Sequence, residues 1–173
     1  MPHRYKPNPF AGPASHTPPG RVVTPEIAAF CTSGVSIVIG TLGPDRRAVT
    51  GRALACVTDG PAVRLLFDTD GNDALMAAMA ASAPIAATFS EPLTHRSLQL
   101  KAARGESVPP APGDLEEMAR QSRHFTAVLE TIGYSHAFAA AYCRLDPAQV
   151  RACAFVPTAA FEQTPGPAAG RAL

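Results

Sequence analysis

Short apolar runs separated by tight turns mark the first half of the chain. The runs are Val35–Thr41, Ala48–Val57 and Ala62–Phe67, and the turns between them hold Gly43-Pro44-Asp45 and Thr58-Asp59-Gly60-Pro61. Runs of this length that are rich in β-branched residues and bounded by Gly, Pro and Asp are typical of strands. We therefore predict a meander of three antiparallel strands with short connections.

Three further strands are expected in the rest of the chain. Ile85–Phe89 and Val150–Val156 are mainly apolar, whereas Arg96–Ala103 alternates between polar and apolar residues. An alternation with a period of two is typical of a strand with one face in the core. The sequence therefore predicts six strands.

Helical segments are predicted between these strands. These helices are supported by strong helix formers and by cap residues at their starts. The longest segment also has an apolar stripe at helical spacing. The four segments are one opening at Thr24-Pro25, one capped by Asn72 or Asp73, Asp114–Ile132, and Ser135–Tyr142.

The order of these elements indicates one mainly β domain with flanking helices. Most strands follow one another directly, one short helix crosses between the third and the fourth, and the last strand returns late. A small closed barrel suits that order because closure removes exposed strand edges. We assign this domain to residues 21–173. Residues 1–20 are rich in Pro and are predicted to form an extended N-terminal arm.

Composition narrows the class of function. The chain has 173 residues and a hydrophobic content of 46%, which is enough for one sizeable core. The formal net charge of +1 gives no electrostatic reason to bind nucleic acid or a membrane. No signal peptide and no apolar run of bilayer length is visible, so we expect a cytoplasmic protein.

Residues with candidate chemistry are sparse. The four cysteines, Cys31, Cys56, Cys143 and Cys153, form no CxxC pair and lie in apolar surroundings, which predicts buried free thiols. The histidines are scattered without the helical spacing of a two-His metal site, so no metal is predicted. No serine lies in a nucleophile elbow, and the catalytic residues are left unassigned.

Three segments carry a resemblance to a known family: SGVSIVIGT followed by GRALACV, FSEPLTHRSLQLKA, and FEQTPGPAAGR. In these segments the chain resembles the pyridoxamine 5'-phosphate oxidase-related FMN-binding split-barrel family, from about Thr24 to Arg171. The resemblance implies a six-stranded antiparallel split β-barrel. It also implies a homodimer that holds FMN in a cleft between its two subunits.

The resemblance further implies a set of cofactor-binding residues. Arg52 matches the strand arginine that reaches the FMN phosphate in the family, and Ser97 stands where the family has a Gln that contacts the flavin. The helix that starts at Asn72 offers backbone N–H groups to an anion. The candidate residues are Arg52, Ala53, Leu54, Thr69, Asn72, Arg96, Ser97 and Arg171.

The chain also departs from the family pattern. The basic pair that opens the helix in the family falls near Asn72-Asp73-Ala74, and the Gly that closes the strand motif falls at Ala102. Asp68 and Asp70 add negative charge where the phosphate should lie, which opposes its binding. Two alternatives stay open. Arg52 either binds the phosphate or faces solvent on the polar side of its strand. Gln163–Arg171 covers either a sheet edge or the cofactor cleft.

The sequence supports three hypotheses of function. The first is an FMN-binding flavoprotein, an oxidoreductase of the pyridoxamine 5'-phosphate oxidase-like class with an unassigned substrate. The alternative is a non-catalytic split-barrel protein that binds haem, a deazaflavin or another small anionic ligand. The third is a purely structural dimer.

Overall fold

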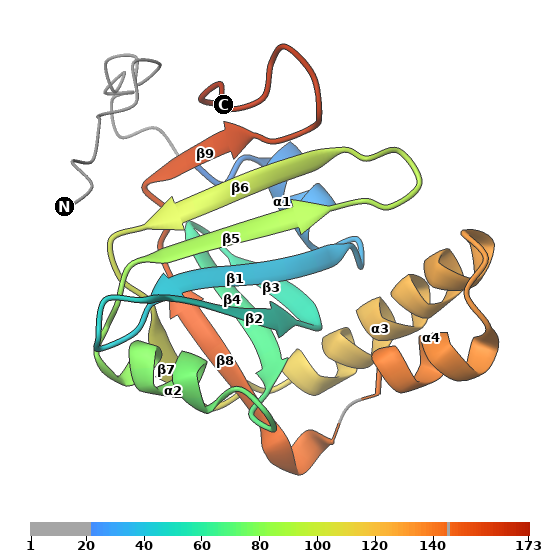
Figure 1. Ribbon diagram of the computed structural model, residues 1–173, viewed down its shortest axis with the longest axis horizontal. Coiled ribbons are helices and arrows are strands. Elements are labelled where there is room, and N and C mark those ends of the chain that lie inside the picture. The colour runs from blue at the N-terminus through green and yellow to red at the C-terminus, as the bar shows by residue number, and fades with distance from the viewer. Residues whose placement is uncertain (1–21, 145) are drawn as a thin grey trace, which may run out of the picture.

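The computed structural model describes residues 22–144 and 146–173, and these form two antiparallel sheets with helices packed around them (Figure 1). The predicted N-terminal arm lies outside the described residues. The five-stranded sheet has the order β2 (Ala48–Ala53), β1 (Ser36–Leu42), β5 (Ile85–Ser90), β6 (Ser97–Ala102), β9 (Ala159–Glu162). The four-stranded sheet has the order β3 (Ala55–Asp59), β4 (Ala62–Asp68), β8 (Val150–Phe155), β7 (Glu106–Val108).

The prediction of a mainly β antiparallel fold is confirmed, because all the strand pairs are antiparallel. The count of six strands is wrong, since the described residues contain nine strands in two sheets. Within the described residues, no strand pair joins the two sheets into a continuous closed barrel.

One of the additional strands arises from a corner in the predicted strand Ala48–Val57. Ala53 pairs with Ile37 in the five-stranded sheet, whereas Ala55 pairs with Leu66 in the other sheet. Leu54 lies between them, and its N–H donates to the Leu66 carbonyl at 2.7 Å. The chain therefore passes from one sheet to the other at Leu54, and one predicted strand becomes β2 and β3.

The helices agree closely with the sequence analysis. They are α1 (Pro25–Cys31), α2 (Asp73–Ala80), α3 (Asp114–Thr131) and α4 (His136–Tyr142), with a short 3₁₀ turn η1 (Pro147–Gln149) before β8. Side-chain caps fix two of the starts: Thr24 accepts from the Ile27 N–H at 3.2 Å, and Ser135 accepts from the Phe138 N–H at 3.3 Å.

The main core lies between the two sheets and the smaller clusters lie under α3. The largest fully buried side chains of the main core include Ile37, Ile39, Leu65, Phe67, Phe89 and Leu100. On the other face of the four-stranded sheet, Met118 of α3 packs on Leu66 and Val150. Both faces of β4 are therefore covered, which explains its nearly continuous apolar sequence.

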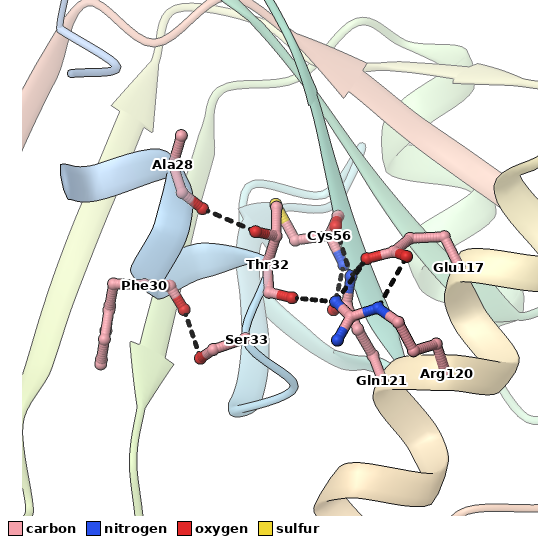
Figure 2. A network of polar contacts seen from close by, with 8 residues as sticks. All are labelled: Ala28, Phe30, Thr32, Ser33, Cys56, Glu117, Arg120 and Gln121. Carbon is pink, nitrogen blue, oxygen red and sulfur yellow. Dashed lines mark hydrogen bonds and ion pairs between the residues drawn. The ribbon is translucent and has the colours of Figure 1, made fainter. Parts of the chain in front are cut away.

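A buried polar network fixes α3 to the edge strand β3 (Figure 2). The Gln121 side chain accepts from the Cys56 N–H at 3.0 Å and donates to the Cys56 carbonyl at 2.7 Å. Gln121 also donates to the Glu117 carboxylate. Arg120 donates both to Glu117 and to the Thr32 carbonyl at the end of α1. The Gln121 amide thus supplies the hydrogen bonds that a neighbouring strand would give to Cys56.

The four cysteines are buried and free, as the sequence predicts. Burial raises the pKa of the Cys153 thiol to about 12. Burial and the neighbouring Cys31 raise the pKa of Cys56 as well. The Cys56 and Cys153 thiols therefore stay protonated and unreactive in the folded chain.

Candidate functional site

Arg52 lies near the end of β2 and contacts the end of α4. Its Nη2 atom donates to the Tyr142 carbonyl, and its guanidinium lies over the Tyr142 ring at 3.8 Å from the ring centroid. The last carbonyls of a helix have no partner within it, so a cation at that end is stabilising. Arg52 is therefore not simply a solvent-facing arginine, because it satisfies the C-terminus of α4 and stacks on its last aromatic ring.

An open pocket of about 320 Å³ surrounds this contact. It is lined by Arg52, Leu54, Asp68, Asp70, Asn72, Ala141, Tyr142 and Arg144. A second pocket of about 460 Å³ shares Asp68, Asp70 and Arg144 and adds Thr69, Asp73 and Asp146, among others. The structure thus brings four of the predicted residues, Arg52, Leu54, Thr69 and Asn72, to one continuous groove.

The loop between β4 and α2 holds Thr69 and Asn72 in place. Thr69 donates through its hydroxyl to the Gln149 side chain at 2.9 Å, and the Asn72 amide donates to the Asp68 carbonyl at 2.7 Å. Asn72 occupies the N-cap position of α2 but makes no capping bond with its side chain. A Cβ at Gly51 would lie 2.8 Å from the Asn72 Oδ1 atom, so this glycine allows β2 to approach the loop.

Ala53 is buried and lies at the floor of the site rather than on its surface. With Arg52, Leu54 and Ser122 it lines an internal cavity of about 10 Å³. The Ser122 hydroxyl is buried without a hydrogen-bond partner among the described residues. The lining is mainly apolar, and a cavity of this size holds at most about one water molecule. Because Ala53 is buried, it packs beneath the site.

The other predicted residues lie toward the opposite edge of the five-stranded sheet. Arg96 pairs with Glu26 of α1 at 2.8 Å and stacks on Phe30, with 4.6 Å from the guanidinium carbon to the ring centroid. Ser97 is buried and its hydroxyl donates to Ser90 at 2.9 Å. These contacts give Arg96 and Ser97 partners from the same chain, while the Arg96 side chain stays about half exposed.

Arg171 lies in the C-terminal segment, which runs along the outer edge of β9. The Arg171 carbonyl accepts from the Glu162 N–H at 2.9 Å, and Phe161 pairs with Ala172. Nearby, the Thr164 hydroxyl and backbone N–H lower the pKa of the Glu162 carboxyl. Of the two interpretations of this tail, the contacts support the cover of a sheet edge.

The eight candidate residues therefore form two separate groups. Arg52, Thr69 and Asn72 lie with their neighbours at the β2 edge, and Arg96, Ser97 and Arg171 lie at β6 and beyond. Neighbouring strands are about 4.8 Å apart, so the three intervals from β2 to β6 span about 14 Å. The two groups therefore lie on different parts of one chain, too far apart to surround the same end of a small ligand.

Sequence reasoning missed the part of the site that α4 supplies. Tyr142 and Arg144 line the Arg52 pocket, although Tyr142 is 90 residues from Arg52 in the sequence. A weak signal was present, because Phe138 and Tyr142 are four residues apart and so share one face of α4.

The described residues show neither a metal centre nor a membrane helix. No group of three or more His, Cys, Asp or Glu side chains among them could hold a metal ion. No helix among them is both long enough and apolar enough to span a bilayer.

Comparison with solved structures identifies the fold. HupZ from Group A Streptococcus aligns with a TM-score of 0.53 and 12% identity, over 85% of this chain and 98% of HupZ. A candidate pyridoxamine 5'-phosphate oxidase from Lactobacillus delbrueckii aligns with a TM-score of 0.50 and 12% identity, over 83% of this chain and 96% of that one. An F420 reductase aligns with a TM-score of 0.49 and 15% identity, over 76% of this chain and 93% of the reductase.

No protein-family model matches the sequence, and no match was found among curated proteins. The structural alignments nevertheless extend over most of the chain and nearly all of each matched chain. The chain therefore has the split-barrel fold of the pyridoxamine 5'-phosphate oxidase-like proteins, as its sequence resemblance implies. At this level of identity the similarity assigns the fold and leaves the activity to be argued from the site.

Proposed function

We propose that this chain is an FMN-binding flavoprotein, an oxidoreductase that works as a homodimer with the cofactor between two copies. The division of the candidate residues between two parts of the five-stranded sheet carries this proposal. Because neither group surrounds a ligand alone, a second copy would complete the site by placing its Arg96 group opposite the Arg52 group. A two-fold axis would then create two equivalent sites.

The groove offers suitable partners for the parts of FMN. Leu54, Ala141 and the edge of the Tyr142 ring provide apolar surface beside a planar ring, and Arg52 and Arg144 provide two positive charges for a phosphate. When bound, FMN supplies the transfer of electrons or hydride. The residues of this chain would then bind and orient it, which agrees with the lack of an evident catalytic proton donor in the sequence.

The charges in the groove limit how well the phosphate fits. Asp68 and Asp70 line the same pocket as Arg52 and Arg144, so the four formal charges cancel. Arg52 also bonds to the Tyr142 carbonyl, and a phosphate has to compete with that contact. The pocket therefore suits the ring better than the phosphate, and we expect an affinity well below that of a site with a dedicated basic pair.

The same two carboxylates favour a second candidate function. A split-barrel protein without redox activity could bind a ligand whose anionic group lies away from Asp68 and Asp70. Haem and a deazaflavin are planar ligands of this kind, and another small anionic ligand would serve as well. In this case the ring surface at Leu54 and Tyr142 is kept, and the phosphate position is not used.

The test is a titration of the purified protein with FMN, followed by flavin absorbance and fluorescence. We expect binding in the wild type and a ten-fold to hundred-fold weakening in Arg52→Ala, roughly the worth of one charge-assisted hydrogen bond. Arg123→Ala removes an exposed arginine of α3 outside the groove and serves as the matched control. A thermal melt of each variant without ligand separates loss of binding from loss of the Arg52–Tyr142 contact.

A colourless protein that takes up no FMN would overturn the first proposal. Native mass spectrometry with haem, a deazaflavin and small phosphorylated ligands then tests the second candidate. Binding of one of these in the wild type, with loss in Tyr142→Ala, would support a binding protein without flavin chemistry. Light scattering tests the homodimer directly, and a monomer at micromolar concentration would contradict it.

A further inference from the structure

Three aromatic rings, from α4 and the segment just before it, form a continuous exposed row, the aromatic row. Tyr134, Phe138 and Tyr142 are 49%, 46% and 37% exposed, although each is large and mostly apolar. The ring centroids of Tyr134 and Phe138 are 4.7 Å apart and those of Phe138 and Tyr142 are 5.8 Å apart, with an interplanar angle of 18° in both pairs. Contiguous apolar surface of this kind marks an interaction site more often than a scattered exposed residue does.

The aromatic row leads directly into an acidic groove. Tyr142, its last ring, lines the pocket that contains Asp68 and Asp70, and the adjoining pocket adds Asp73 and Asp146. The cations on these two pockets are Arg52, which is already bonded to Tyr142, and Arg144. The surface therefore combines a row of stacked, partly exposed aromatic rings with an excess of negative charge at one end.

From these features we propose that, in the chain free of FMN, the aromatic row and the acidic groove bind residues 1–21 of this chain. That segment lies outside the described residues, and only its sequence enters the argument. It contains six prolines, the aromatic residues Tyr5 and Phe10, and the basic residues Arg4, Lys6 and Arg21, without any Asp or Glu. Its prolines and aromatic residues suit the aromatic row, and its basic residues suit the negative charge of the groove.

Each half of this complementarity has a physical basis. Proline rings pack against exposed aromatic side chains, and a Pro-rich backbone loses little conformational entropy when it binds because its φ angles are already restricted. The basic side chains match the four carboxylates of the groove. A segment of 21 residues spans up to about 70 Å when extended, which exceeds the diameter of about 40 Å of a domain of this size.

A second copy of the folded domain fits the aromatic row less well than it fits the Arg52 end of the groove. Two aromatic rows placed together would bury the rings, but they would bring no positive charge to Asp70 or Asp73. Desolvated carboxylates without partners would oppose such a contact. A basic Pro-rich segment covers the rings and supplies the missing cations together.

The test places a photo-crosslinker within the aromatic row of the full-length protein. Phe138 is replaced by p-benzoylphenylalanine, which keeps an aromatic ring at that position, and cross-linked peptides are mapped by mass spectrometry after irradiation. We expect capture of residues 1–21 as the main product. The same probe at Leu93, which is 52% exposed on the loop between β5 and β6, is the matched control and should capture little of that segment.

The electrostatic part is tested by removing charge from the groove. Asp70→Asn with Asp73→Asn changes two exposed carboxylates to amides of equal size and should lower the yield of this cross-link at least three-fold. Raising the salt concentration from 50 to 500 mM should lower it as well. Capture of residues 22–173 of a second copy, or no capture of residues 1–21 in the unaltered groove, would overturn the proposal.

Discussion

The bond between Gln121 and the edge strand β3 gives the sharpest prediction for the stability of this fold. Gln121 and Cys56 are both fully buried, and the Gln121 side chain satisfies both the N–H and the carbonyl of Cys56. Gln121→Leu keeps a side chain of similar size but leaves both backbone groups without partners. Water cannot replace the lost bonds unless the structure opens.

The magnitude follows from the number of groups that lose a partner. An unsatisfied buried donor or acceptor costs about 1–3 kcal/mol, so the two Cys56 groups together cost about 2–6 kcal/mol. Burial of the leucine methyl groups offsets about 1–2 kcal/mol of this loss. We expect a net decrease of about 3 kcal/mol in the free energy of unfolding, and a decrease in Tm of about 6–12 °C for a chain of this length.

Urea unfolding followed by circular dichroism measures this change. Arg123→Leu, an exposed position on the same helix, is the matched control and should change the free energy by less than about 0.5 kcal/mol. In Gln121→Glu, the carboxylate opposes the Cys56 carbonyl at neutral pH, so part of the lost stability should return as the pH falls and the new carboxyl is protonated. A Gln121→Leu variant within 1 kcal/mol of the wild type would refute the role assigned to this amide.

Three further predictions concern charge, thiols and packing. Asp114 is buried, and burial alone would raise its pKa. Its hydrogen bonds with Arg64 and the Ala111 N–H nevertheless hold the pKa below the ordinary 3.8. The Asp114–Arg64 pair therefore stabilises the fold fully above pH 3.8 and less as the pH falls through the lowered pKa. Asp114→Asn should lower the free energy of unfolding, measured with urea at pH 7, by about 3–5 kcal/mol. It should also weaken the dependence of that free energy on pH below about pH 4, and an unchanged dependence would contradict this. Cys153, whose burial raises its pKa to about 12, should react with a thiol reagent at pH 8 only after unfolding. Gly105→Ala should lower Tm measurably, because the new Cβ would lie 2.4 Å from the Ile85 side chain; an unchanged melt would show that Ile85 moves aside at no cost.

Much of the fold could be predicted from the sequence because its signals are local. The apolar run Val35–Thr41 and the helical stripe of Asp114–Ile132 each span enough residues to show a period, and both elements occur close to their predicted bounds. The strands that were missed are short or interrupted. β7 and β9 have three and four residues, which is too few for an alternation to stand out.

The site was less predictable because its contacts join distant parts of the chain. Arg52 and Tyr142 are 90 residues apart, and Arg96 and Glu26 are 70 residues apart. The sequence marked each arginine as a charge that needs a partner, but no periodicity identifies that partner. The family resemblance named the residues, whereas only the fold shows that they form two groups on one chain.

The central claim is that two copies of this chain hold FMN in shared sites. Native mass spectrometry of the protein after incubation with FMN tests it most directly, because it reports the number of chains and of cofactors in one measurement. We expect a complex of two 18.0 kDa chains with two FMN molecules. In Arg52→Ala, we expect the dimer to remain and its FMN occupancy to fall. A monomer, or a dimer that stays free of FMN at saturating concentration, would contradict it.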